Sequence, residues 1–169
     1  LRAGVDVLVE KPVADSAAAG ERLAELAEKN GRILQVGHLE RFNPAVVALE
    51  RVITIPLFFE VHRLSVFTPR SLDVDVVLDL MIHDLDIVLN LVREKPSEIR
   101  GAGISVLSTN VDIANARLAF PGGCVANLTA SRVSTEKVRK LRLFQPNQYI
   151  SLDYARQDAL SFAVNAQTP

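Results

Sequence analysis

An acidic side chain and an imidazole stand four residues apart, at Asp79 and His83, within an apolar stretch that runs from Val74 to Val92. Apolar residues recur there at spacings of three and four, which predicts an amphipathic helix. Residues four apart on a helix are stacked neighbours, so Asp79 and His83 would share one face, and Asp86 could reach the same imidazole. A carboxylate fixes the tautomer of an imidazole and raises its pKa, which suits proton transfer. The same spacing also fits a solvated acidic helix face with one incidental histidine.

The ends and the outer face of this helix can also be predicted. Asp73 or Asp75 would cap its first turn, because a carboxylate satisfies free backbone N–H groups and favours the positive end of the helix dipole. Pro96 lies just beyond its end. Asp84 would point into water, because adjacent helical positions do not share a face.

A second pair of polar side chains follows two short apolar runs. Residues 5–9 predict a buried strand, residues 17–30 a helix closed by a glycine, and residues 33–36 a second strand. This order predicts a βαβ unit with parallel strands and a right-handed crossover. Ligand sites of parallel sheets lie beyond the carboxyl ends of the strands, so Lys11 and His38 would share one rim.

The rest of the chain predicts one further helix and an antiparallel sheet. Asn43 and Pro44 are typical of a helix cap and first turn, so a helix would begin there and run to about residue 52. Pro121, Gly122 and Gly123 indicate a hairpin. The predicted strands are 57–67, 99–107, 113–120, 124–131, 138–144 and 149–153, and the tail after Phe162 is uninformative. The fold class is therefore α/β (α+β), with a βαβ unit followed by an open, largely antiparallel sheet.

Composition narrows the class of protein. The chain has 169 residues, of which 49% are hydrophobic, so it suits one domain, or one and a fraction, with an ample core. Its net charge of −1 gives no signal for nucleic acid or membrane binding, and no apolar run approaches the roughly 20 residues that span a bilayer. The single cysteine, Cys124, excludes an internal disulfide and fits a reducing cytoplasm; we expect it to be a small buried hydrophobe.

Three motifs, in this order, resemble one protein family. They are Glu10-Lys11-Pro12 after the first strand, Gly37-His38 with Arg41-Phe42-Asn43-Pro44 after the second, and Asp79-x-x-x-His83 on the later helix. Together with the change from βαβ to antiparallel sheet, they resemble the glucose–fructose oxidoreductase/inositol dehydrogenase (Gfo/Idh/MocA) family of sugar oxidoreductases. The resemblance covers essentially the whole chain.

The resemblance implies two domains and a shared site. Residues 1–42 would be the last part of a Rossmann domain that binds NAD or NADP, and residues 43–169 a substrate domain whose open sheet forms a homodimer or homotetramer contact. The resemblance implies that Lys11, Asp79 and His83 are catalytic. By the same likeness, Glu10, Lys11, Pro12 and His38 would contact the cofactor, and Arg41, Asn43, Lys11 and His83 the substrate.

The implied activity is hydride transfer between a nicotinamide cofactor and a secondary alcohol of a sugar, sugar nucleotide or cyclitol. The run from Asp75 to Asp84 looks most like family members that oxidise the 3-position of UDP-N-acetylglucosamine. Either His83 or Lys11 could be the base. The chain lacks the G-x-G-x-x-G fingerprint of dinucleotide binding. We therefore expect an internal portion of a longer, cytoplasmic enzyme that alone is inactive and binds dinucleotide weakly.

Two other functions fit some of the residues. His38, His62, His83, Asp79 and Asp86 are suitable ligand types for a metal-dependent isomerase or hydrolase, but no tight ligand motif is present and we predict no metal site. A non-catalytic dimerisation module would need only the antiparallel sheet. Lys11 could also be an ordinary surface lysine, and Arg41 could simply pair with Glu40 or Glu50.

Overall fold

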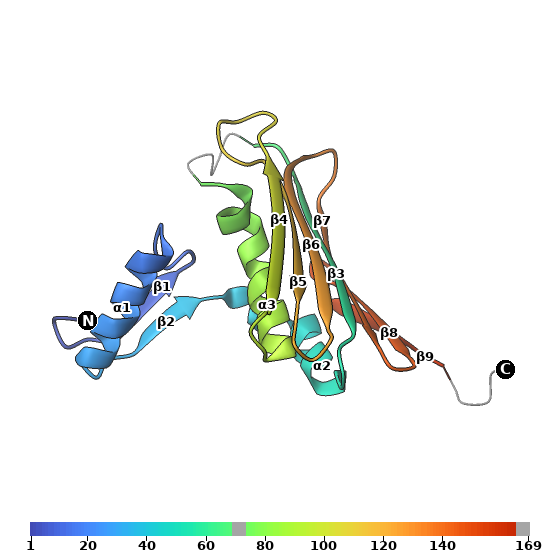
Figure 1. The fold of residues 1–169 in the computed structure, drawn as a ribbon, viewed down its shortest axis with the longest axis horizontal. Coiled ribbons are helices and arrows are strands. Elements are labelled where there is room, and N and C mark those ends of the chain that lie inside the picture. Colours follow the sequence, from blue (N-terminus) through green and yellow to red (C-terminus); the bar gives the residue numbers. More distant parts are fainter. Residues whose placement is uncertain (69–73, 165–169) are drawn as a thin grey trace. The chain divides into compact units, whose positions relative to one another are not determined.

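The computed structural model describes residues 1–68 and 74–164 (Figure 1). The chain forms two compact units, Leu1–Leu39 and the part that begins at Glu40, and each is described by itself. Within the described residues, no helix combines the length and the apolar character needed to cross a membrane.

The first unit is a strand, a helix and a strand. Strand β1 (Val7–Glu10) and strand β2 (Leu34–Gly37) pair in parallel. Helix α1 (Ala17–Lys29) lies between them in the sequence. Gly31 follows α1 with a φ of +57°, the left-handed conformation that favours glycine at a helix end. The predicted βαβ order is thus confirmed. The predicted burial of the first strand is wrong, because a two-stranded sheet with one helix leaves Leu8 74% exposed.

A short 3₁₀ helix, η1 (Leu39–Phe42), and helix α2 (Pro44–Val52) follow. The Asn43 side chain accepts a hydrogen bond from the Ala45 N–H at 3.1 Å, which confirms the predicted cap. Val46 and Leu49 are fully buried on one face of α2, as its apolar spacing predicts.

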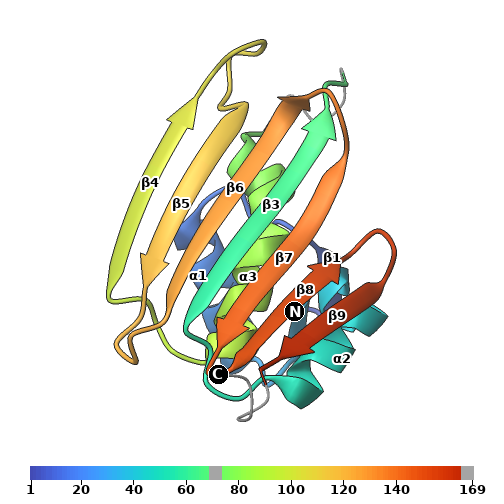
Figure 2. The same cartoon turned by 90° about the vertical axis from the view of Figure 1, so that its right-hand side faces the viewer.

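Seven strands form the sheet of the second unit, in the order β4-β5-β6-β3-β7-β8-β9 (Figure 2). Only the central pair β3–β6 is parallel; the other pairs are antiparallel, which confirms the predicted fold class. The strands are β3 (Phe58–Val66), β4 (Glu98–Ile104), β5 (Ile113–Ala119), β6 (Val125–Ser134), β7 (Val138–Gln145), β8 (Gln148–Asp153) and β9 (Asp158–Ala163). Strand β9 was not predicted, because it is an edge strand whose six residues are all exposed and show no burial pattern.

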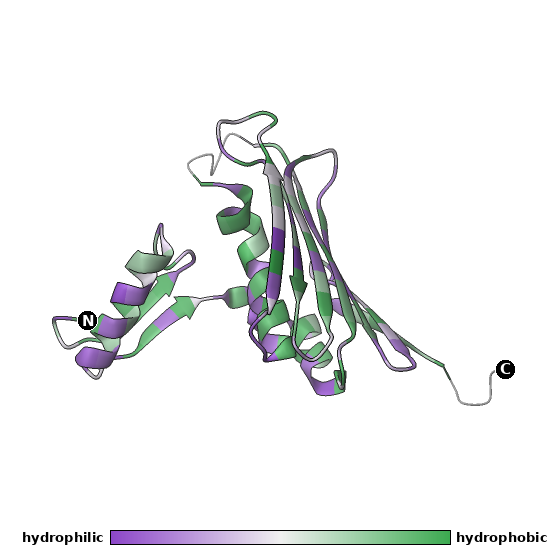
Figure 3. Ribbon diagram, in the orientation of Figure 1, coloured by the Kyte–Doolittle hydropathy of each residue, from purple (hydrophilic) through white to green (hydrophobic). Residues whose placement is uncertain are grey.

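The sheet is covered on one face. Helices α2 and α3 lie against that face, and the ribbon of α3 is largely apolar (Figures 1 and 3). Along β3, Phe59 and Val61 are buried while Phe58 and Glu60 are only half-buried, so the strand alternates between the core and an open face. Cys124 is buried in the same core, as its small apolar side chain predicts.

The helix predicted from residue 74 to 92 is divided in two. A π-helical turn, η2 (Val77–Met81), precedes the regular helix α3 (Ile82–Val92). The Asp75 carboxylate accepts hydrogen bonds from the N–H groups of Val77 and Leu78 at 2.9 and 3.0 Å, so Asp75 caps the turn. Asp73, the other predicted cap, lies outside the described residues. The prediction of one continuous α-helix is therefore correct only from Ile82 onward.

One buried carboxylate organises the loop between β4 and β5. Asp112 is fully buried and accepts hydrogen bonds from the backbone N–H groups of Val106, Leu107 and Ser108 at 2.7–2.9 Å, and from the Ser108 hydroxyl at 2.6 Å. These hydrogen bonds, that from the hydroxyl first, hold the pKa of Asp112 well below its usual range. Arg132 lies 3.7 Å from Asp112 and donates to the Val74 carbonyl, which ties this loop to the start of η2.

Candidate functional site

The predicted residues of the first unit follow the carboxyl ends of its two strands. Glu10 and Gly37 are register partners across β1 and β2, so Lys11 and His38 are the next residues at the same edge of the sheet. Pro12 comes directly after Lys11, and the bond between them is cis. Glu10, Lys11, Pro12 and His38 thus gather at one edge, where a parallel sheet presents its ligand site.

The remaining predicted residues belong to the second unit. Arg41 and Asn43 lie in and after η1, Asp79 lies within the π turn η2, and His83 is the second residue of α3. Asp79 and His83 are both half-buried and lie on consecutive turns. π-helical turns occur frequently at functional sites, so the interruption coincides with the predicted proton-transfer residues.

Arg41 forms an ion pair with Asp86. Its Nε and Nη2 atoms donate to the two carboxylate oxygens at 2.6 and 2.5 Å. The hydrogen bonds from Arg41 therefore go to Asp86. The alternative prediction, that Arg41 pairs with Glu40 or Glu50, is wrong. This bidentate contact holds η1 against α3, one turn beyond His83.

Asn43 connects three parts of the second unit. Its oxygen caps α2, and its amide nitrogen donates to the Tyr154 carbonyl at 3.0 Å and to Glu40 Oε1 at 3.1 Å. Since Asn43 is buried, these contacts give it a structural role whatever part it has in substrate binding.

The prediction for Asp84 is wrong. Its side chain is 2% exposed and accepts two hydrogen bonds from Arg63, from Nε to Oδ2 at 2.7 Å and from Nη2 to Oδ1 at 2.8 Å. The sheet packs against this side of α3, and Arg63 of β3 provides a buried guanidinium there. The Asp84 carboxylate therefore points into the interior, where it binds Arg63. Burial raises the pKa of the Asp84 carboxyl, and the two hydrogen bonds from Arg63 oppose that rise.

Glu40 is the second partner of Arg63. Arg63 Nη1 donates to Glu40 Oε2 at 3.0 Å, so one buried guanidinium joins η1 to α3. Burial raises the pKa of Glu40, but the charge of Arg63 and the hydrogen bonds from Asn43 and Arg63 outweigh it and leave that pKa below its ordinary value. The charge of His83 acts on Glu40 in the same direction, so His83 lies within electrostatic range of this carboxylate.

Arg139 and Tyr154 also belong to this group. We call the five residues the inner charge cluster: Glu40, Arg63, Asp84, Arg139 and Tyr154. The Arg63 guanidinium lies 5.0 Å from the centre of the buried Tyr154 ring. Arg139 of β7 is the register partner of Arg63, so both side chains lie on the helix-covered face. The charge of Asp79 acts on Arg139 and that of His83 on Glu40, so both members of the Asp79–His83 pair lie within electrostatic range of the cluster.

Sequence patterns did not predict this cluster, although one signal was present. Arg63 falls in phase with Phe59 and Val61 along β3, and Arg139 falls in phase with Leu141 and Leu143 along β7. A charged residue in the buried phase of a strand must find a partner, because an unpaired buried charge is very costly. That partner is Asp84, next to His83.

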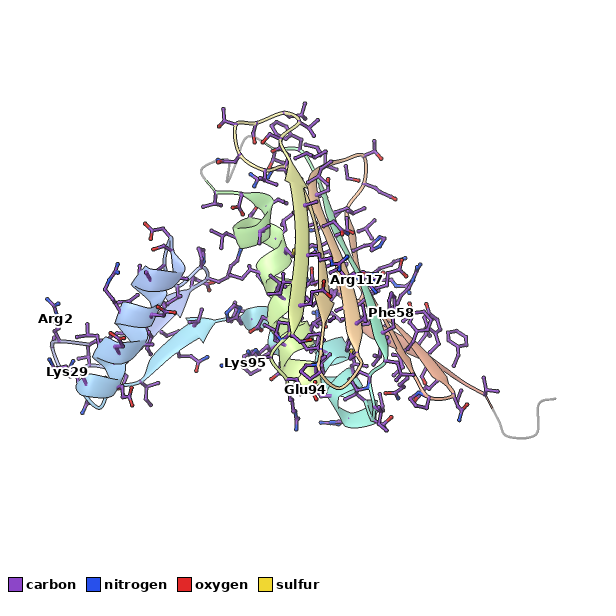
Figure 4. The ribbon with its side chains drawn as sticks, viewed as in Figure 1. Arg2, Lys29, Phe58, Glu94, Lys95 and Arg117 are labelled. Carbon is purple, nitrogen blue, oxygen red and sulfur yellow. The ribbon has the colours of Figure 1, made fainter. Side chains whose placement is uncertain are left out.

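The open face of the sheet carries a broad groove of about 730 Å³. Figure 4 marks two of its residues, Phe58 and Arg117. His62 lies in this groove with Nε2 3.4 Å from Glu60 Oε1, on the side of β3 opposite to Arg63. The groove therefore does not include the Asp79–His83 pair. Within residues 1–68 and 74–164, no three His, Cys, Asp or Glu side chains are grouped as metal ligands would be.

The chain is similar to known oxidoreductases along most of its length. Residues 1–38 match an oxidoreductase family with an NAD-binding Rossmann fold, and residues 52–146 match the GFO/IDH/MocA C-terminal domain. UDP-N-acetylglucosamine 3-dehydrogenase of Acidithiobacillus ferrooxidans is 39% identical over 91% of this chain and 50% of its own length. Inositol 2-dehydrogenase of Rubrobacter xylanophilus is 30% identical over 76% of this chain and 40% of its own.

Solved structures give the same result. The structure of UDP-N-acetylglucosamine 3-dehydrogenase from A. ferrooxidans matches with a TM-score of 0.91 and 37% identity, over 99% of this chain and 54% of that one. A levoglucosan dehydrogenase in complex with NADH and levoglucosan matches with a TM-score of 0.88 over 98% of this chain and 52% of that one; at 18% identity, this shows the fold alone. The chain spans about half the length of the relatives it matches.

Proposed function

The chain belongs to the GFO/IDH/MocA family of oxidoreductases, and on that basis we propose that its protein is an NAD(P)-dependent dehydrogenase acting on a sugar nucleotide. The reaction moves a hydride between a nicotinamide cofactor and a secondary alcohol, at the 3-position of UDP-N-acetylglucosamine. The family comprises dehydrogenases that act on CH–OH groups of sugars and cyclitols, and the sugar nucleotide is the narrower proposal.

One observation carries this choice of substrate. The 39% identity to UDP-N-acetylglucosamine 3-dehydrogenase extends over 91% of the chain, so the match includes residues of both units. The matches to inositol 2-dehydrogenases are weaker and shorter, at 30% identity over 76% of the chain for the R. xylanophilus enzyme. This longer and stronger match supports a sugar nucleotide over a cyclitol as the substrate.

In the proposed mechanism, His83 takes the proton of the reacting hydroxyl. Asp79, one turn before it, orients the imidazole and stabilises the imidazolium that forms. Lys11 donates a hydrogen bond to the reacting oxygen and stabilises the developing negative charge. The reverse assignment, with Lys11 as the base and His83 as the group that positions the substrate, uses the same residues. Arg41 and Asn43 contact the sugar.

The residues of the first unit fit the nicotinamide end of a dinucleotide. Its parallel strands end at Glu10 and Gly37, and the carboxyl edge of a parallel sheet is where dinucleotides bind. Glu10, Lys11, Pro12 and His38 would line that end, and residues 1–42 would belong to the cofactor domain. A bound nicotinamide supplies the hydride acceptor. The 169 residues hold no G-x-G-x-x-G loop for the phosphates.

Residues 43–169 would form the substrate domain, with an oligomer contact on the open face of the sheet. The aromatic rings of Phe58, Phe144, Tyr149 and Phe162 follow one another across that face, with centroids 5.0–6.0 Å apart. Aromatic residues are enriched in protein interfaces. This surface supports a homodimer or homotetramer.

The test of the proposed function is a reduction assay on the full-length protein. NAD⁺ or NADP⁺ is supplied with UDP-N-acetylglucosamine, myo-inositol or glucose, and reduced nicotinamide is followed by its absorbance. We expect turnover with the sugar nucleotide and a kcat/KM at least tenfold lower with the two uncharged compounds. Equal turnover with inositol, or no turnover with any of the three, would overturn the proposal. Activity that required an added divalent metal would favour the metal-dependent alternative.

A further inference from the structure

Arg139 is the second guanidinium of the inner charge cluster, and its side chain is half-buried. Its Nε atom is buried and has no hydrogen-bond partner among the described residues. Arg63, its register partner in β3, uses three of its nitrogens on Asp84 and Glu40. Two arginines thus face the same side of the sheet, and Arg63 is the one that two carboxylates hold.

The surroundings of Arg139 leave its charge under-compensated. Glu40 of η1, Asp79 of η2 and Asp84 of α3 stabilise its charged form at a distance, but burial and the charge of Arg63 outweigh them and lower the pKa of Arg139. Glu40 and Asp84 are already held by hydrogen bonds to Arg63. A half-buried guanidinium in this position would gain from hydrogen bonds to an anionic ligand.

We propose that Arg139 binds an anionic group of the substrate, the diphosphate of a nucleoside diphosphate sugar, beside the Asp79–His83 pair. This inference rests on the proposed function and adds to it a residue that selects charged sugars over neutral ones. A guanidinium suits this task because its fork of N–H groups matches the geometry of phosphate oxygens. Arg139 reaches the ligand from β7, while His83 acts from α3.

A purely structural role is the rival explanation. Arg139 could serve only to offset the negative charges of Glu40, Asp79 and Asp84 through space. Loss of the guanidinium would then lower stability and leave ligand affinity unchanged. A direct role in binding predicts the opposite, which makes affinity for a charged fragment the measurement that separates the two.

The experiment measures binding of UDP to the full-length protein by isothermal titration calorimetry, with Arg139→Gln and Arg139→Lys. Hydrogen bonds to charged groups contribute roughly 1.5–3 kcal/mol, so Arg139→Gln should weaken UDP binding by about 10- to 100-fold. Arg139→Lys keeps the charge without the fork of N–H groups, so its affinity for UDP should lie between those of the wild type and Arg139→Gln. Arg142→Gln is the matched control: the same loss of charge in β7, but on the open face, where Arg142 pairs with Glu60. It should leave the Kd for UDP unchanged.

NADH is titrated into the same variants, because the cofactor also carries a diphosphate. An unchanged Kd for NADH with a weakened Kd for UDP supports the proposal. Parallel weakening of both would assign the anion to the cofactor and overturn it, as would equal UDP affinity of the wild type and Arg139→Gln, or no UDP binding by the wild type. If Arg139→Gln melts at a much lower temperature, the comparison uses Arg139→Lys.

These results are separable from the test of the proposed function, because UDP binding needs no turnover. An inactive protein that bound UDP through Arg139 would contradict the proposed reaction and keep this inference. If the protein oxidises UDP-N-acetylglucosamine but Arg139→Gln leaves its affinity for UDP unchanged, the proposed reaction stands and this inference is contradicted.

Discussion

Arg63 and Asp84 face each other across the interior of the second unit, with 1% and 2% of their side chains exposed and two parallel hydrogen bonds of 2.7 and 2.8 Å between them. Asp84 directly follows His83, so the pair fixes the turn of α3 that carries the imidazole against strand β3. A buried, bidentate contact of this kind restricts both side chains to one geometry.

Breaking this pair should be strongly destabilising. Arg63→Met leaves the Asp84 carboxylate buried without its partner, and we expect a loss of about 3–5 kcal/mol in the free energy of unfolding, measured by urea denaturation. The double variant Arg63→Met/Asp84→Leu removes both charges and should be more stable than Arg63→Met alone. Arg100→Gln is the control: its partner Glu98 and Arg100 itself are 52% and 76% exposed, and its loss should cost less than ~1 kcal/mol.

Removing the proposed acid–base residues should lower turnover. In the full-length protein, His83→Ala and Lys11→Ala should each reduce kcat by ~10²–10⁴-fold, the usual effect of losing a general acid or base. His62→Ala provides a matched control, because His62 lies on the open face of the sheet beside Glu60. Near-native turnover of both His83→Ala and Lys11→Ala at neutral pH would contradict their assignment.

Acid should weaken the loop that Asp112 organises. Its pKa is lowered in the folded state, so the carboxylate contributes stability above the unfolded pKa of about 3.9, and this contribution is lost as the pH falls below that value. Asp112→Asn should therefore have a lower Tm than the wild type at pH 7, and the difference should shrink between pH 4 and pH 2. Thermal unfolding followed by circular dichroism across this range provides the measurement. A difference that stayed constant with pH would show that ionisation of Asp112 plays no part.

Cys124 should react slowly while the protein is folded. Burial, with a smaller contribution from the negative charge of Glu94, raises the pKa of the Cys124 thiol to about 11. At pH 8 roughly one molecule in a thousand would carry the reactive thiolate. A thiol reagent such as Ellman's reagent should modify the native protein over hours and the urea-unfolded protein within minutes. Equally fast modification of both would show that the thiol is accessible.

The aromatic surface of the open face should control association. Phe144→Glu places a charge between Phe58 and Tyr149, whose ring centroids lie 6.0 and 5.0 Å from that of Phe144. We expect the molar mass measured by light scattering to fall towards that of a monomer. Leu107→Glu, at an exposed position in the loop between β4 and β5, adds the same charge away from these rings as a control. An unchanged mass for Phe144→Glu would remove the open face from the oligomer contact.

Local patterns predicted those elements that bury one face and end at a clear cap. The βαβ unit, the Asn43 cap, the hairpin at Gly122 and Gly123, and the burial of Cys124 all follow from residues close in sequence. Each depends on contacts within one element or between neighbouring elements, which periodicity and turn chemistry describe well.

The inner charge cluster could not be predicted in the same way, because its contacts join residues far apart in sequence. The helix considered alone predicts that Asp84 faces solvent. Asp84 is buried because strand β3 packs against this side of the helix and its Arg63 side chain binds the carboxylate. The π turn at Val77–Met81 likewise has no pattern of its own. The inward phase of Arg63 was the available signal, and a count of charges in the buried phase of each strand would have found it.

The parallel pairing of β3 with β6 has a consequence for how the chain acquires its structure during synthesis. The middle strand of the sheet leaves the ribosome long before either neighbour, since these begin only at Val125 and Val138. Contacts so distant in sequence form slowly, and an unpaired strand with apolar residues is prone to associate with other chains. A nascent polypeptide released before β7 would therefore expose the strand Phe58–Val66, and protection by a chaperone would matter most during that interval.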